Sequence, residues 1–166
     1  MSFEEPLKVL VVDDHAGIRV GIAGLIDAQC GRMCCVGAAA TGREALARTR
    51  ELQPHVIVLD VNLNGEDGLA LIPTLRRDAC SAIVVLTSFT DPQIAVRAMR
   101  LGAHACLNKT SPAADLMDAI VAAGHAEEHC LGTTPSNAGG AFSHAPGTNR
   151  PSPVGALADA PRRTDP

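Results

Sequence analysis

The chain has 166 residues, of which 46% are hydrophobic and 19% are charged, enough for one domain of modest size with a single packed core. Its formal net charge is −4, from 14 Lys and Arg against 18 Asp and Glu, and the basic residues form no cluster. These figures exclude a large multidomain enzyme and argue against nucleic-acid binding by this chain alone.

The sequence also lacks the features of a membrane or secreted protein. No apolar run approaches the roughly 18 residues that a membrane-spanning helix needs. The N-terminal segment carries Glu4 and Glu5 where a secretory signal would carry positive charge. We therefore expect a cytoplasmic protein with no membrane partner.

Short strand-like segments alternate with helical periodicity through the first 123 residues. The strand candidates are residues 7–12, 34–38, 55–60, 82–87 and 104–108. The third and fourth are apolar almost throughout, which is typical of parallel strands covered on both faces. The pattern predicts a parallel sheet.

Helix signals lie between these strands. Apolar residues recur at helical spacing in residues 18–26, and Thr41 with Glu44 forms a capping box that predicts a helix through about residue 52. The pairs Asp-Pro at 91–92 and Ser-Pro at 111–112 each place a capping residue before a proline, which is typical of helix starts. Five βα units predict an α/β fold: an open, doubly wound parallel sheet with helices on both faces.

Polar side chains gather where these strands end. The residues are Asp13 and Asp14 after the first strand, Asp60 at the end of the third, Thr87 at the end of the fourth and Lys109 after the fifth. Because ligands of open α/β sheets bind at the carboxyl ends of the strands, we expect these side chains to converge on one pocket.

Three carboxylates at one sheet edge repel one another unless a cation lies between them. Oxygen ligands of this kind suit Mg²⁺, which completes its coordination with water and a phosphoryl oxygen. A carboxylate can itself accept a phosphoryl group, and Asp60 is the most central of the three. Mg²⁺, Lys109 and Thr87 would then supply the positioning and charge stabilisation that phosphoryl transfer needs.

Four segments, VLVVDDH, VIVLDVNLNGEDGL, VVLTSF and GAHACLNKT, together resemble the receiver domain of two-component response regulators, most closely the NarL/FixJ type. The resemblance covers about residues 7–123. It implies a flavodoxin-like (βα)5 sheet with the strand order 2-1-3-4-5. An acidic pair, an Asp, a Thr and a Lys at successive strand ends form a more specific signature than any one motif.

The resemblance implies a role for each residue of this set. It makes Asp60 the phosphoacceptor, Asp14 a direct ligand of Mg²⁺ and Asp13 a ligand acting through a water. It assigns a metal-binding backbone carbonyl to Asn62. Thr87 matches the switch hydroxyl that turns toward the phosphoryl group, and Lys109 matches the ammonium that pairs with it. The phosphoryl donor would be a sensor histidine kinase or a phosphotransfer protein.

Two positions depart from the family pattern. Cys106 stands where the family has a Tyr or Phe ring coupled to the switch hydroxyl, so we expect weaker coupling between phosphorylation and the fourth helix, which begins at Asp91-Pro92. Asn64 stands before Gly65 where the family often has Pro. An Asn-Gly turn needs no proline, and we expect this second change to be neutral.

The sequence therefore predicts a stand-alone receiver that is not an enzyme and signals through contacts with a downstream protein partner. The sequence does not decide whether phosphorylation also forms a homodimer. An alternative is a degenerate receiver, or the remnant of a DNA-binding regulator, that acts only as an interaction module. A haloacid-dehalogenase-type phosphatase also uses Asp, Mg²⁺ and Lys. Such enzymes carry D-x-D after the first strand, whereas this chain has Asp60 on the third strand and Asn62 in place of a second acid.

The composition changes near Gly124. Gly and Pro make up 12 of the 43 residues from 124 to 166, but only 14 of the first 123. This segment has few large apolar side chains and lacks the two periodic helices of a helix-turn-helix domain. We expect residues 7–123 to form the receiver domain and residues 124–166 to form a low-complexity, disordered tail.

A chain shortened to end near Gly124 is predicted to melt within about 4 °C of the full chain, a difference equivalent to about 1 kcal/mol in a domain of this size. The reason is that the tail has too little apolar surface to join the core. Thermal unfolding followed by circular dichroism tests this. A larger drop would show that part of the tail packs on the domain.

Overall fold

The computed structural model describes residues 5–29 and 31–131. Five parallel strands form one sheet in the order β2-β1-β3-β6-β7, which confirms the predicted order 2-1-3-4-5 under a different numbering. The strands are β1 (Leu7–Val12), β2 (Met33–Ala39), β3 (Val56–Asp60), β6 (Ala82–Thr87) and β7 (Ala105–Asn108). The predicted open, doubly wound α/β fold is confirmed.

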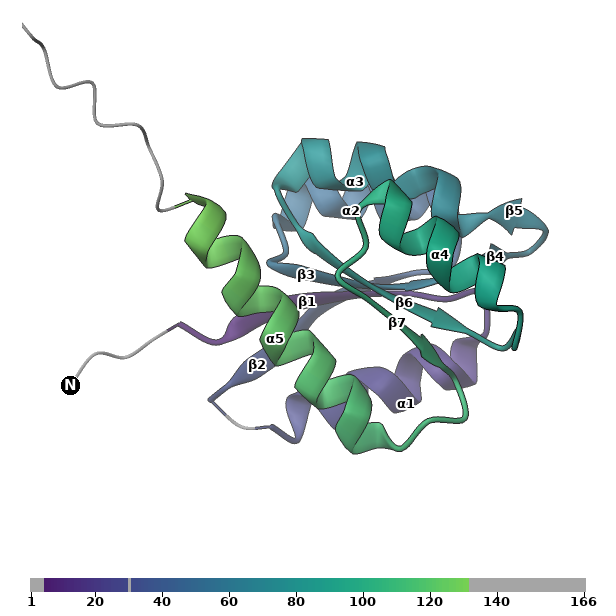
Figure 1. The fold of residues 1–166 in the computed structure, drawn as a ribbon. Coiled ribbons are helices and arrows are strands. Elements are labelled where there is room, and N and C mark those ends of the chain that lie inside the picture. Colours follow the sequence, from purple (N-terminus) through teal and green to yellow (C-terminus); the bar gives the residue numbers. More distant parts are fainter. Residues whose placement is uncertain (1–4, 30, 132–166) are drawn as a thin grey trace, which may run out of the picture. The chain divides into compact units, whose positions relative to one another are not determined.

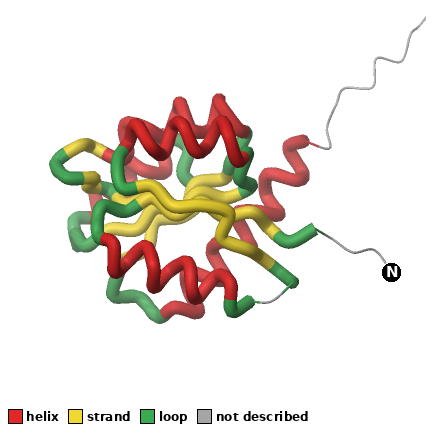
Figure 2. The backbone as a smooth tube through the Cα atoms, turned by 180° about the vertical axis from the view of Figure 1, so that it is seen from behind, coloured by secondary structure: helices red, strands yellow, loops and turns green. Residues whose placement is uncertain are grey.

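Helices cover both faces of this sheet (Figures 1 and 2). One face carries α1 (Ala16–Asp27) and α5 (Ala113–Leu131), and the other carries α2 (Gly42–Leu52), α3 (Ile72–Ala79) and α4 (Pro92–Leu101). A short 3₁₀ helix, η1 (Gly68–Leu71), leads into α3. Among the described residues, every helix is too short or too polar to cross a membrane.

The alternation of side chains along each strand divides the core into two layers. In β3, Val56 and Val58 pack toward α1 and α5, whereas Ile57 and Leu59 pack toward α2, α3 and α4. All four side chains are at most 1% exposed. This is why the sequence shows a continuous apolar run there and no alternation with polar residues.

Two of the three predicted helix starts are confirmed by their caps, and the third helix, α5, begins at Ala113, one residue after the predicted Pro112. Thr41 Oγ1 accepts a hydrogen bond of 3.2 Å from the backbone N–H of Glu44, and Asp91 Oδ1 accepts one of 2.9 Å from the N–H of Gln93. Pro92 is the first residue of α4, where its missing N–H leaves no hydrogen bond unmade. These local signals set where α2 and α4 begin.

The sequence did not predict a two-stranded hairpin between β3 and η1. Its strands, β4 (Asn62–Leu63) and β5 (Glu66–Asp67), pair antiparallel through a turn at Asn64 and Gly65. Both turn residues have positive φ, 53° and 89°, as this type of tight hairpin turn requires. The Asn-Gly pair thus closes the turn without the family's usual proline.

At its C-terminal end, α5 continues past the expected domain boundary to Leu131. Gly124 is buried within it, and a Cβ atom at that position would lie 2.7 Å from Leu7 Cδ1. Shortening the chain after Leu131 leaves this contact intact, so it tests the tail more cleanly than a cut at Gly124. The disorder predicted for residues 124–166 is therefore wrong for residues 124–131, which are helical, and residues 132–166 lie outside the described residues.

Gly68 allows the chain to pass close behind the end of β3. A Cβ atom at Gly68 would lie 2.1 Å from the carbonyl oxygen of Asp60, so no side chain fits without moving the backbone. The Gly68 N–H also donates a 2.8 Å hydrogen bond to the carbonyl of Val61. This close approach connects the packing of η1 to the placement of Asp60.

Gly68→Ala is therefore predicted to lower the free energy of unfolding by about 1–3 kcal/mol, the usual cost of overpacking. Gly24→Ala is the matched control, because Gly24 is an exposed residue of α1 with open space around its Cα. That substitution should raise the free energy of unfolding by about 0.5–1 kcal/mol through helix propensity. Urea unfolding of both variants measures the difference, and equal effects would contradict the steric argument.

Candidate functional site

Four strands deliver the predicted residues to one edge of the sheet. Asp13 and Asp14 directly follow β1, and Asp60 is the last residue of β3. Thr87 is the last residue of β6, and Lys109 directly follows β7. Because all the strands run parallel, their carboxyl ends meet at this edge, as the sequence predicted.

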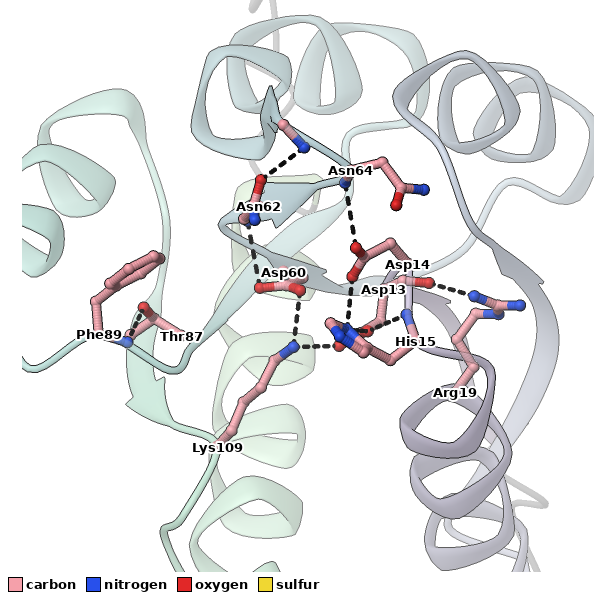
Figure 3. Close-up of polar contacts among 11 residues, drawn as sticks. Asp13, Asp14, His15, Arg19, Asp60, Asn62, Asn64, Thr87, Phe89 and Lys109 are labelled. Atoms are coloured by element: carbon pink, nitrogen blue, oxygen red, sulfur yellow. Dashed lines mark hydrogen bonds and ion pairs between the residues drawn. The ribbon is translucent and has the colours of Figure 1, made fainter.

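Lys109 lies between two buried carboxylates (Figure 3). Its Nζ is 2.7 Å from Asp60 Oδ2 and 2.6 Å from Asp13 Oδ2. The Asp13 and Asp60 residues are only 1% and 5% exposed. One ammonium group therefore compensates two carboxylates that water hardly reaches.

The pKa values reflect this crowding of charge. Burial raises the pKa of Asp60, and the nearby Asp13 raises it further, while Lys109 acts in the opposite direction. Burial alone would lower the pKa of Lys109, but its hydrogen bonds to Asp13 and Asp60 raise it. The lysine therefore stays a cation, whereas ionisation of Asp60 is less favourable than that of a free aspartate.

Asp14 has a different environment at the rim of the cluster. Burial acts to raise its pKa, but the N–H of Asn64 at 3.2 Å from Oδ2 and the imidazole of His15 at 2.7 Å from Oδ1 together lower it. Asp14 is therefore ionised more readily than Asp60.

The Asn64 contact corrects one expectation from the sequence. We expected Asn in place of the usual Pro to be neutral, but the backbone N–H of Asn64 donates to Asp14. Proline has no N–H and could not make this bond. The departure therefore changes how the hairpin of β4 and β5 holds an acid of the cluster.

Two further contacts were not anticipated from the sequence. The exposed side chain of His15 bridges Asp14 and Asp13, with Nδ1 2.7 Å and 3.3 Å from their oxygens. Arg19, on α1, donates a 2.6 Å hydrogen bond to the carbonyl oxygen of Asp13. The position of His15 beside the acidic pair was a signal for the first contact, but no sequence pattern indicated the second.

Thr87 and Asn62 lie at the same edge with different partners. The hydroxyl oxygen of Thr87 accepts a 3.0 Å hydrogen bond from the N–H of Phe89. The Asn62 N–H donates to Asp60 Oδ1 at 3.3 Å, and its side-chain oxygen accepts from Gly65 at 2.9 Å. In Figure 3 Thr87 is joined to Phe89, and the carboxylates are joined to Lys109 and His15.

The donor atoms of this edge fit a small divalent cation. Asp13, Asp14, His15 and Asp60 each place a ligand atom within 4.8 Å of the others. Three of the four are carboxylates, the hard oxygen ligands that Mg²⁺ prefers, and their combined charge exceeds that of the single lysine. A divalent cation would balance this excess of negative charge.

With this fold and this site, the chain belongs to the response regulator receiver domain family, whose sequence profile matches residues 9–121. It is 34% identical over 115 residues to the response regulator protein VraR of Staphylococcus aureus. That match covers 69% of this chain and 54% of VraR, so the chain spans about half the length of this curated relative.

Solved receiver structures have the same fold. The response regulator domain of Thermotoga maritima CheB is 29% identical, with a TM-score of 0.67 over 73% of this chain and 98% of that chain. The receiver domain of a NarL response regulator from Mycobacterium tuberculosis is 26% identical, with a TM-score of 0.68 over 74% and 98%. Receiver domains are signalling modules that interact with histidine kinases or phosphotransfer proteins and are phosphorylated on an aspartate.

The raised pKa of Asp60 predicts a specific pH dependence in metal-free protein. The folded state binds the Asp60 proton more tightly than the unfolded chain does. The stabilising contribution is therefore fully present below about pH 4 and is lost as the pH rises through the raised pKa. The free energy of unfolding of the wild type minus that of Asp60→Asn should therefore be larger at about pH 4 than at about pH 7.

Urea unfolding in the presence of EDTA measures this difference. Asp118→Asn, which neutralises an exposed acid of α5, controls for the loss of one negative charge. If Asp118→Asn shows the same pH dependence as Asp60→Asn, the effect comes from net charge and not from the crowded site.

Proposed function

We propose that this chain is a phosphorylation switch that accepts a phosphoryl group on Asp60 and transmits the change through protein contacts. The observation that carries the proposal is the position of Lys109, whose Nζ is within 2.7 Å of both Asp60 and Asp13. A charged lysine beside a buried carboxylate supplies the cation that a phosphorylated aspartate needs.

Each neighbouring residue has a defined part in this proposal. Asp13, Asp14 and the backbone carbonyl of Asn62 would hold Mg²⁺ together with Asp60. When bound, the ion would neutralise charge on the phosphoryl oxygens. Lys109 would pair with one of these oxygens, and the hydroxyl of Thr87 would donate a hydrogen bond to another.

The transfer itself needs no further nucleophile. A carboxylate oxygen of Asp60 forms a bond to phosphorus, and the bond from phosphorus to the donor breaks. In a kinase or phosphotransfer partner the donor is a phosphohistidine, whose imidazole nitrogen leaves with the electron pair. The protein's contribution is position and charge, so the chain is modified once per event and is not a turnover enzyme.

A second function is favoured by Cys106. Its half-buried thiol stands where the family has an aromatic ring. Phosphorylation of Asp60 therefore has no ring at this position to displace. In this alternative the chain is an interaction module that binds a kinase or another partner and conveys nothing on phosphorylation. The two functions differ in whether Asp60 is modified and whether the fold responds.

Incubation with acetyl phosphate and Mg²⁺ is predicted to add one phosphoryl group, a mass increase of about 80 Da. Asp60→Asn should abolish the increase because it removes the accepting carboxylate, and EDTA should suppress it. Intact-mass spectrometry provides the readout. The exposed acid at Asp118 provides a matched control, since Asp118→Asn should be modified like the wild type.

An undiminished adduct on Asp60→Asn would overturn the assignment of the phosphoacceptor. Absence of any adduct on the wild type, with both acetyl phosphate and a phosphorylated histidine kinase as donors, would leave the interaction module as the function.

A further inference from the structure

A hollow of about 300 Å³ lies beside Thr87, between the start of α4 and β7. Its walls include Thr87, Phe89, Pro92, Ala95, Cys106 and Asn108. Cys106 is only partly buried, and burial raises the pKa of its thiol, so the sulfur remains a small, neutral, apolar group. The side chain at this point is too small to fill the space.

Phe89 lies at the rim of this hollow and is only half buried. It is 53% exposed, although an aromatic ring gains by burial. It is also the one Phe, Tyr or Trp among residues 5–29 and 31–131, because the chain has no Tyr or Trp and its other two Phe fall outside those ranges.

The backbone of Phe89 is tied to the switch hydroxyl. Its N–H donates a 3.0 Å hydrogen bond to Thr87 Oγ1. The residues from Ser88 to Asp91 are exposed and belong to no helix or strand, whereas α4 starts at Pro92 with its own cap from Asp91. Residues 88–90 can therefore change conformation without loss of the α4 cap.

We propose that Phe89 supplies the mobile ring of the switch in this chain, in place of the ring that Cys106 lacks. This inference rests on the proposed phosphorylation of Asp60. When the Thr87 side chain rotates so that its hydroxyl donates to a phosphoryl oxygen, Oγ1 moves away from the Phe89 N–H and the hydrogen bond between them is lost. The loop is then released, and the ring enters the hollow against Cys106.

The consequence is a change in the exposed apolar surface beside α4. That helix already exposes Val96 and Met99, which are 43% and 50% exposed. Withdrawal of Phe89 removes an aromatic side chain from the loop that precedes them. A protein partner that contacts this loop would then distinguish the phosphorylated state from the unphosphorylated state.

The experiment follows the solvent exposure of the ring directly. Incorporation of 4-fluorophenylalanine labels three positions, and Phe89→Leu identifies the resonance of Phe89. A soluble gadolinium chelate broadens each ¹⁹F signal according to its exposure. With Mg²⁺ and beryllofluoride, a phosphoryl mimic, the broadening at Phe89 is expected to fall by about twofold or more, because a ring in a close-packed site is shielded from solvent.

Two substitutions at one position provide the matched controls. Cys106→Tyr fills the hollow, so the ring of Phe89 should remain exposed in the presence of beryllofluoride. Cys106→Ser leaves the hollow open and should behave like the wild type. If Phe89 becomes shielded equally in Cys106→Tyr, it does not enter the hollow and the inference is wrong.

Intact mass after treatment with acetyl phosphate separates this inference from the proposed function. If the wild type takes up the phosphoryl group and Phe89 stays exposed with beryllofluoride, the ring is not part of the switch and phosphorylation of Asp60 still stands. If no phosphoryl group is taken up from any donor, the proposed function fails and the inference fails with it.

Discussion

The repulsion between buried carboxylates at the carboxyl edge of the sheet is the constraint on which the rest of the structure depends. Asp13 and Asp60 are almost fully buried, and Asp14 lies beside them. Lys109 is the ammonium group placed between the two buried acids. The remaining negative charge suits the edge to a divalent cation. Burial raises the pKa of Asp60, and the nearby Asp13 raises it further.

The fold maintains this arrangement by packing the acids onto rigid elements. Two hydrophobic layers hold the central strand β3 on both of its faces, so Asp60 at its end has little freedom. Gly68 lets η1 pass directly behind it. The hairpin of β4 and β5 then returns to the cluster, where Asn64 donates to Asp14. The apolar contacts of the two core layers thereby hold the mutually repelling carboxylates in place.

Transmission of a change at Asp60 depends on the neighbouring strand end. Thr87 is buried, and its hydroxyl already bonds to the backbone of Phe89 in the loop before α4. A phosphoryl group at Asp60 would attract that hydroxyl, and the rotation of Thr87 toward it would move Oγ1 away from the Phe89 N–H. In the proposed switch, this movement connects Asp60 to the Phe89 ring. The hollow beside Cys106 connects two arguments. It is the space that the family's ring would fill, and it is the space that the Phe89 ring is proposed to enter.

The amino-acid sequence by itself determined the architecture and most of the candidate site. Apolar runs and helix caps are local patterns, so they predicted the strands and the starts of α2 and α4, and parallel strands necessarily bring Asp13, Asp60 and Lys109 to one edge. Only the tertiary structure decided the bond from Asn64 to Asp14, the close approach of Gly68 to Asp60 and the hollow beside Cys106. Those features join residues from different elements at distances of a few ångströms, and no periodicity along the chain encodes such distances.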